Sequence, residues 1–115
     1  MCHVLIIEDE PLVAMAIEIA LEEAGATSFD IAENEQDAVI AARRRRPEVI
    51  TSDVKLKAGT GPLAVQAIRA EQGDTPVIFV TGSPEECQPC DPPGIVLTKP
   101  FNASHLIDAF RQSRP

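Results

Sequence analysis

Five side chains that could bind a cation or a phosphoryl group follow the ends of four apolar runs. Glu8 and Asp9 follow the run VLII, Asp53 follows VITS, Thr81 follows VIFV, and Lys99 follows IVLT. A carboxylate at the end of a buried strand is costly to place unless a charged or polar group pairs with it. If the four runs are neighbouring parallel strands, one edge of the sheet holds three carboxylates, a hydroxyl and an ammonium group.

Together these groups have the chemistry for phosphoryl transfer onto a carboxylate. Glu8, Asp9 and Asp53 repel one another unless a cation joins them, and their hard oxygen ligands suit Mg²⁺. Lys99 supplies a compact positive charge that can hold Asp53 and later a phosphoryl oxygen. Asp53 would attack phosphorus in line and form an acyl phosphate, while the metal and Lys99 neutralise the equatorial oxygens. The added charge, about −1.5 to −2, can pull Thr81 and its loop inward.

Strands and helices alternate along the chain. Buried-type strands are predicted at residues 3–7, 48–53, 76–81 and 95–98, with a weaker strand at 28–32. Helices are predicted at 11–24, 35–46, 62–72 and 103–113, with Asn34 and Asn102 as N-caps. Four prolines between Gly82 and Gly94 leave room for one helical turn at most, at residues 84–87. The pattern predicts an α/β fold, a doubly wound parallel sheet whose ligands bind at the carboxyl ends of the strands.

Each helix is expected to bury one apolar face. The residues predicted to face inward are Val13, Ala16, Ile17, Ala20, Leu21 and Ala24 in the first helix, Leu63, Ala64, Ala67 and Ile68 in the third, and Ala103, Leu106, Ile107 and Phe110 in the last. Leu12, Met15 and Ile19 form a second apolar stripe, about 120° around the first helix. A helix with one buried side does not need this second stripe.

Length and composition favour one globular domain, residues 1–115. The hydrophobic fraction is 44% and the formal net charge is −8, which disfavours nucleic acid as a partner. The only basic cluster, Arg43 to Arg46, fits a solvated helix end better than a docking patch. No apolar run is long enough to span a membrane. The N-terminus has no signal-peptide pattern, so we expect a cytoplasmic protein.

The cysteines do not form a recognisable framework. Three cysteines are an odd number, which does not indicate a set of disulfides. Cys87 and Cys90 match a C-x-x-C pattern, but they lie in a proline-rich loop rather than at a helix start, and two further zinc ligands are missing. A redox or metal role for this pair is therefore the weaker interpretation.

The motifs closely resemble the receiver domain of two-component response regulators over the whole chain. They are Ile7-Glu8-Asp9-Glu10, Asp53 with Leu56 and Gly61, Thr81-Gly82, and Lys99-Pro100-Phe101. The resemblance implies a flavodoxin-like five-stranded sheet of order 2-1-3-4-5. It implies that Asp53 accepts phosphate from a phospho-histidine of a sensor histidine kinase or histidine phosphotransfer protein. It also implies that Asp9 and Asp53 bind Mg²⁺ directly, Glu8 binds it mostly through water, and the backbone carbonyl of Lys55 completes the protein ligands.

The sequence departs from the common receiver pattern in three places. Val96 stands where the family usually has an aromatic switch residue, and the chain contains no Tyr. Lys57 stands where the common receiver has Pro, and the fourth helix of the family is short or absent. The Phe79-Val80-Thr81-Gly82 stretch resembles a receiver subgroup of alphaproteobacteria marked by a Phe-x-Thr-Gly motif and partnered with atypical histidine kinases. We therefore expect phosphorylation of Asp53 to be read mainly through residues 81–94.

These features favour a phosphorylatable single-domain response regulator. The chain ends directly after the last predicted helix, so output would be by protein contact or as a phosphate shuttle or sink, although a piece of a longer regulator would look the same. The alternative is a pseudo-receiver that binds partners without phosphorylation. A small aspartyl-phosphate hydrolase is disfavoured because Lys55 stands where such enzymes usually have a second Asp.

The second apolar stripe is the predicted docking surface for the phosphodonor. Leu12, Met15 and Ile19 would lie next to the acidic site, together with the loop Pro100-Phe101-Asn102. Exposed apolar stripes commonly mark partner sites. The alternative is that these residues pack within the domain or in a homodimer.

Overall fold

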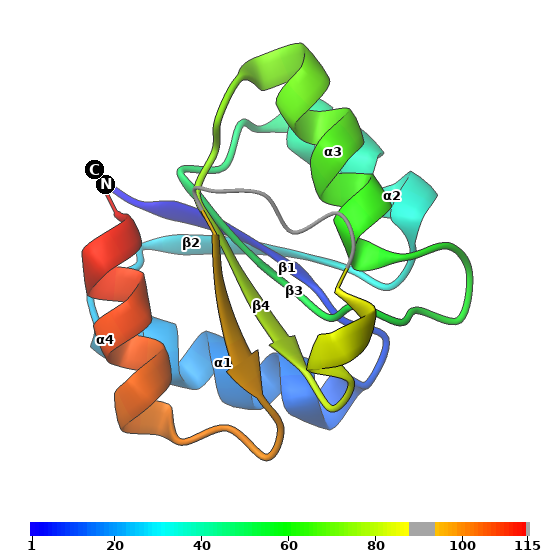
Figure 1. Ribbon diagram of the computed structural model, residues 1–115. Helices are drawn as coiled ribbons and strands as arrows, with labels where there is room; N and C mark the ends of the chain where they lie inside the picture. The colour runs from blue at the N-terminus through cyan, green and yellow to red at the C-terminus, as the bar shows by residue number, and fades with distance from the viewer. Residues whose placement is uncertain (88–93, 115) are drawn as a thin grey trace.

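The computed structural model describes residues 1–87 and 94–114. In chain order its elements are β1 (His3–Ile7), α1 (Pro11–Glu23), β2 (Ser28–Ala32), α2 (Glu35–Arg44), β3 (Val49–Ser52), α3 (Gly61–Gln72), β4 (Val77–Thr81), the 3₁₀ turn η1 (Pro84–Glu86), β5 (Gly94–Thr98) and α4 (Ala103–Ser113). The five strands form one sheet of order β2-β1-β3-β4-β5 (Figure 1). Every neighbouring pair is parallel. The predicted doubly wound, flavodoxin-like topology is confirmed.

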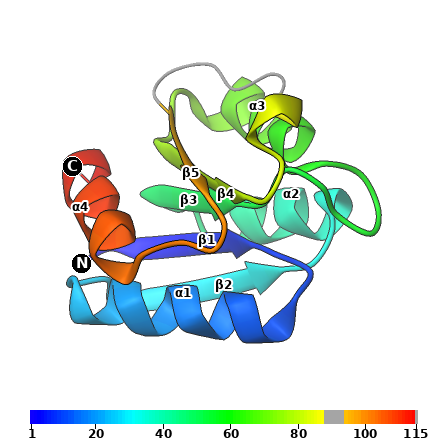
Figure 2. The same cartoon turned by 60° about the horizontal axis from the view of Figure 1, so that its bottom comes forward.

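The helices cover both faces of the sheet. Helices α1 and α4 lie on one face, and α2 and α3 lie on the other (Figures 1 and 2). Successive side chains of a strand point to opposite faces, so Val4 and Ile6 join the core under α1 and α4. Leu5 and Ile7 join the core under α2 and α3. All of β1 is buried, because strands pair with it on both sides and helices cover both of its faces.

Three helices begin at side-chain caps. The Asn34 side chain accepts a hydrogen bond from Asp37 N, and that of Asn102 accepts one from Ser104 N, so both predicted caps are confirmed. The Thr60 hydroxyl caps α3 by accepting from Leu63 N at 3.3 Å. The sequence prediction began this helix at Pro62 and missed the cap.

The predicted inward faces are partly correct, with errors at three alanines and one leucine. Ala16, Leu63, Ala67 and Ala103 are exposed, whereas Ala14, Val65 and Ala109 are buried. At about 100° per residue, Ala16 lies about 100° from the buried Ile17 and next to the exposed stripe. Ala14 and Ala16 have the same hydropathy, so the pattern could not decide which of them faces the sheet.

Arginines at the end of α2 join this helix to α3. The helix ends at Arg44, two residues earlier than predicted. Arg43 Nε donates to both carboxylate oxygens of Glu71, at 2.8 and 3.0 Å. Arg46 donates to the carbonyl oxygen of Gln72 at 2.7 Å. These two arginines therefore bind a neighbouring helix rather than only solvent.

The connection between β4 and β5 differs from the other crossovers. Among its described residues it holds the single turn η1, which matches the expectation of at most one helical turn. Strand β5 is an edge strand, and Val96 in its middle is 42% exposed. The remaining connection, residues 88–93, includes Cys90 and lies outside the described residues, so the C-x-x-C pair is not described.

Candidate functional site

The carboxyl ends of β1 and β3 bring Glu8 and Asp53 side by side. Ile7 pairs with Ser52 at the last register position of the two strands. Asp53 N then donates to the carbonyl oxygen of Ile7 at 2.9 Å. Strand β3 ends at Ser52, one residue earlier than predicted, so Asp53 is the first residue beyond it. From β1 the chain goes first to β2 on one side and then to β3 on the other, so the direction of strand order reverses between β1 and β3. Doubly wound sheets bind their ligands at the carboxyl ends of the strands at such a reversal.

Lys99 lies between the two buried carboxylates. Its Nζ is 3.0 Å from Glu8 Oε1 and 3.0 Å from Asp53 Oδ2. Its backbone N donates to the carbonyl oxygen of Thr81 at 2.8 Å, which continues the pairing of β4 and β5 beyond Thr98. Glu8 is 1% and Asp53 8% exposed. This geometry gives the ammonium group two charge-assisted hydrogen bonds to largely buried carboxylates.

Burial and charge act in opposite directions at this ion pair. Burial raises the pKa of Glu8; the hydrogen bond from Lys99 opposes the rise, and the charge of Asp53 adds to it. Burial alone would lower the pKa of Lys99, but the hydrogen bonds to Asp53 and Glu8 outweigh it, so this pKa lies above its ordinary value. The lysine therefore stays charged at neutral pH, while Glu8 ionises less readily than an exposed glutamate.

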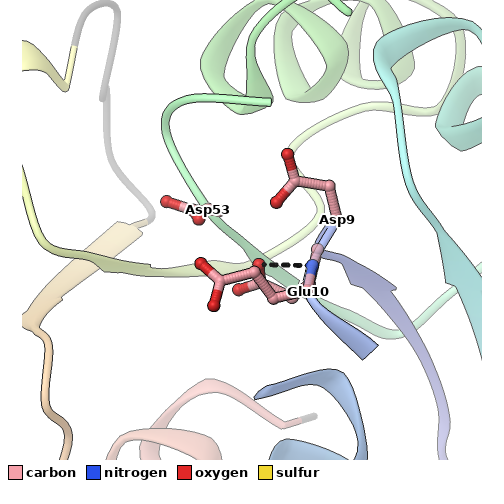
Figure 3. A group of neighbouring side chains, drawn as sticks. Asp9, Glu10 and Asp53 are labelled. Atoms are coloured by element: carbon pink, nitrogen blue, oxygen red, sulfur yellow. Dashed lines mark hydrogen bonds between the residues drawn. The ribbon is translucent and has the colours of Figure 1, made fainter. Parts of the chain in front are cut away.

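Four carboxylates at this edge are close enough to share one cation. One oxygen from each of Glu8, Asp9, Glu10 and Asp53 lies within 4.8 Å of the others. Figure 3 shows Asp9, Glu10 and Asp53 as close neighbours at the ends of their strands. The two Asp53 oxygens have separate donors, because Oδ1 accepts from Val54 N at 2.7 Å and Oδ2 from Lys99. This set of hard oxygen donors fits Mg²⁺.

Glu10 is the member of this group that the sequence reasoning missed. The sequence places it in the Ile7-Glu8-Asp9-Glu10 motif and directly before the helix at Pro11, without a role as a possible ligand. In the structure its backbone N donates to Glu8 Oε2 at 3.2 Å, and its carboxylate lies 4.0 Å from Lys99 Nζ. Its position directly after Glu8 and Asp9 at a strand end was the available signal.

Thr81, at the end of β4, and Lys55, on the β3–α3 loop, are the other two predicted site residues. Thr81 is the buried last residue of β4, and its hydroxyl oxygen accepts from Ser83 N at 2.9 Å. The Lys55 side chain pairs with Oε2 of Glu86, the last residue of η1, at 2.8 Å. Its backbone forms an antiparallel bridge with Thr60. Within the described residues, the Thr81 hydroxyl thus contacts the loop that follows it. The Lys55 ammonium group points towards η1.

Comparison with known proteins identifies the family. The model of the response regulator receiver domain matches residues 4–111. This chain belongs to the response regulator receiver domain family. It is therefore a receiver domain of two-component signalling.

Relatives of this receiver include regulators named PhyR. The phyllosphere-induced regulator PhyR of Methylorubrum extorquens is 33% identical over 114 residues, which cover 96% of this chain and 43% of that protein. The solution structure of the Erythrobacter litoralis PhyR receiver domain is 34% identical with a TM-score of 0.87, and covers 97% of this chain and 88% of that one. The chain spans less than half the length of the curated relatives it matches.

A third neighbour is a receiver described with a bound metal. The receiver domain of sensor histidine kinase PA1611 from Pseudomonas aeruginosa is 28% identical, with a TM-score of 0.84, 97% of this chain covered and 96% of that one. Its structure is described as having a magnesium ion coordinated in the active-site cleft.

None of the helices described in our structure is long and apolar enough to cross a bilayer.

Proposed function

We propose that this receiver accepts a phosphoryl group on Asp53 from a phospho-histidine of a sensor histidine kinase or phosphotransfer protein, with Mg²⁺ as cofactor. The observation that carries the proposal is Lys99 Nζ at 3.0 Å from both Glu8 and Asp53. A lysine in this place holds the acceptor carboxylate before transfer and a phosphoryl oxygen after it. The family and the receiver neighbours support the same reaction.

The acidic cluster supplies the residues that would hold Mg²⁺. Asp9 and Asp53 would be direct ligands, Glu8 a ligand mostly through water, and the Lys55 carbonyl the remaining protein ligand. The clustering of the carboxylate oxygens within 4.8 Å fits such a cation. When bound, the metal neutralises charge on the transferred phosphoryl group.

The transfer step exchanges one bond for another. An oxygen of Asp53 attacks phosphorus, the new P–O bond forms as the P–N bond of the phospho-histidine breaks, and the released imidazole nitrogen takes up a proton. Lys99 then shifts from the Asp53 carboxylate to a phosphoryl oxygen. The Thr81 hydroxyl exchanges its contact with Ser83 N for another phosphoryl oxygen, which draws residues 81–83 inward.

The exposed stripe on α1 is the proposed docking surface for the phosphodonor. Leu12 is 79%, Met15 55% and Ile19 59% exposed, so the stripe does not pack within the described part of the domain. A hollow of about 420 Å³ lined by Val13, Lys99, Pro100 and Phe101 connects this helix to the site. A homodimer through the same stripe is the competing proposal.

Phosphorylation is tested by intact mass after incubation with Mg²⁺ and acetyl phosphate. We expect one phosphoryl adduct in the wild-type protein, none in Asp53→Asn, and loss of the adduct in EDTA. An adduct that forms equally in Asp53→Asn would contradict the assignment. A wild-type protein that gains no adduct but binds its partner would support the pseudo-receiver alternative.

Docking is tested with Leu12→Ala, Met15→Ala and Ile19→Ala in a phosphotransfer assay. The matched control is Leu63→Ala on α3, because Leu63 is also exposed, at 46%, but lies on the opposite face of the sheet. We expect slower transfer from the kinase with unchanged labelling by acetyl phosphate. Unimpaired transfer in all three variants would exclude this surface. A monomeric wild-type protein in light scattering would exclude the homodimer.

A further inference from the structure

The loop between β3 and α3, residues 55–60, connects the acidic cluster to the first turn of α2. On the cluster side, Lys57 N donates to Asp9 Oδ2 at 2.9 Å. On the other side, the loop lies against Glu35, the first residue of α2. One anchor of the loop is therefore Asp9, a proposed metal ligand. The other is Glu35, which lies 25 residues before Thr60 in the sequence.

Glu35 binds this loop at two backbone groups. Its own N donates to the carbonyl oxygen of Ala58 at 3.2 Å, and its Oε1 accepts from Thr60 N, also at 3.2 Å. Gly59, between them, has φ +79°, and an added Cβ there would lie 2.5 Å from Glu35 Cβ. The close approach and the left-handed backbone both require glycine. One residue thus fixes the loop on both sides of its tightest point, through its backbone N at Ala58 and through its side chain at Thr60.

Thr60 transmits this anchoring to Lys55. The two residues form an antiparallel bridge, so the position of the Thr60 backbone sets that of the Lys55 backbone. Gly61 N donates to the carbonyl oxygen of Val54 at 2.9 Å and closes the base of the loop. The loop consequently positions two proposed metal ligands, the Lys55 carbonyl through Thr60 and the Asp9 carboxylate through Lys57.

We propose that Glu35 is a positioning residue that sets the metal affinity of this receiver by clamping the β3–α3 loop. The inference rests on the proposed function, because it assumes that Asp9 and the Lys55 carbonyl ligate the metal. Glu35 is not a metal ligand in this scheme; it acts only through the backbone of Ala58 and Thr60. The clamp depends on the hydrogen-bond acceptor at Oε1 rather than on negative charge, because its partner is a neutral amide.

The test uses Glu35→Ala, Glu35→Gln and the control Gln36→Ala, whose exposed side chain lies on the same turn. Glu35→Gln keeps an acceptor oxygen on the side chain, whereas Glu35→Ala removes it. In metal-free protein, we expect Glu35→Ala to speed amide hydrogen exchange at Lys57 and Thr60. Calorimetry should show about fivefold weaker Mg²⁺ binding, the effect of one lost hydrogen bond. Glu35→Gln and Gln36→Ala should behave like the wild type.

A second variant, Gly59→Ala, tests the clamp independently in case Glu35→Ala does not fold. Gly59→Ala leaves Glu35 intact but pushes the loop away from it, so it should reproduce the faster exchange and the weaker Mg²⁺ binding. Wild-type exchange and affinity in Glu35→Ala would overturn the clamp, and so would equal damage in Glu35→Gln or Gln36→Ala. If Asp53 accepts no phosphate but the exchange and Mg²⁺ results hold, the proposed function fails and the clamp stands.

Discussion

Asp53 lies between two flanks that are built differently. On the α2–α3 flank, the β3–α3 loop is bound by Asp9 and Glu35, and Gly61 packs so closely that an added Cβ would lie 1.7 Å from the Asp53 carbonyl oxygen. On the β4–β5 flank, no atom of the described residues lies within 4 Å of a Cβ added at Gly82. Within the described residues, the glycine of the first flank is closely packed and that of the second is not.

The contrast indicates that the two flanks have different roles in the receiver. The packed flank holds the acceptor and its metal ligands in fixed positions. The open flank carries Thr81, whose hydroxyl contacts only its own loop among the described hydrogen bonds, and Val96, which is exposed where the family usually has an aromatic switch residue. We therefore expect the packed flank to control whether phosphorylation occurs and the open flank to report it.

Loss of Lys99 should have the largest effect, because it joins the two flanks. In Lys99→Met, Glu8 and Asp53 lose their shared counter-ion, and breaking a buried pair costs about 3 kcal/mol. Circular dichroism during urea unfolding measures this, since the chain has no Trp or Tyr for fluorescence. Saturating Mg²⁺ should restore part of the stability but not phosphorylation. The control Lys57→Met removes an exposed ammonium group and should be near neutral; equal loss in both variants would contradict the argument.

Alanine at Gly61 and at Gly82 tests the packing difference directly. Gly61→Ala forces a methyl group against Ser52 and the Asp53 backbone, which should cost about 1–3 kcal/mol and slow phosphorylation. Gly82→Ala meets no atom of the described residues within 4 Å and should stay within about 0.5 kcal/mol of the wild type. Urea unfolding and intact mass measure the two effects. Similar losses in both variants would mean that the open flank is as constrained as the packed one.

The sequence predicted the fold and most of the site for a physical reason. Buried parallel strands produce apolar runs, and a polar residue that ends such a run stands out, which identified Glu8, Asp53 and Lys99. Glu10 and Glu35 were missed because a carboxylate at a helix start is equally well explained as a favourable end charge. The contacts of Glu35 with Ala58 and Thr60, and that of Glu10 with Lys99, join residues far apart in sequence, so the helix-start pattern alone does not contain them.

The same limit explains the errors within the helices. Asn34 and Asn102 were found because a cap is a local signal, whereas Ala16 was placed inward because alanine has almost no preference that distinguishes the two faces. Leu63 has such a preference, yet it is exposed while Val65 is buried. The rotation of α3 is set by its packing on the sheet, which the helix sequence alone does not contain.

A smaller effect should appear in how the free energy of unfolding depends on pH, through the buried carboxyl group of Glu8. Because the pKa of Glu8 is raised in the folded state, the metal-free folded protein keeps this proton at pH values where the unfolded chain has lost it. The free energy of unfolding should therefore fall as pH rises above the ordinary glutamate value. Glu8→Gln removes this contribution, so the difference between wild type and variant across pH isolates it. A difference that does not vary with pH would contradict it.

The ion pair between Lys55 and Glu86 joins the two flanks. We expect it to have the smallest effect on stability but a clear effect on how the β4–β5 flank responds to phosphorylation. Lys55 Nζ lies 2.8 Å from Glu86 Oε2, but both side chains are largely exposed and screened by salt. Lys55→Met should therefore leave the unfolding midpoint unchanged. It should speed amide exchange at Glu86 and Cys87, which belong to η1 and its cap. Beryllofluoride should then change exchange in this turn less in the variant than in the wild type, because one of the contacts that join the turn to the packed flank has already been removed. An identical response in the two proteins would show that the open flank moves independently of Lys55.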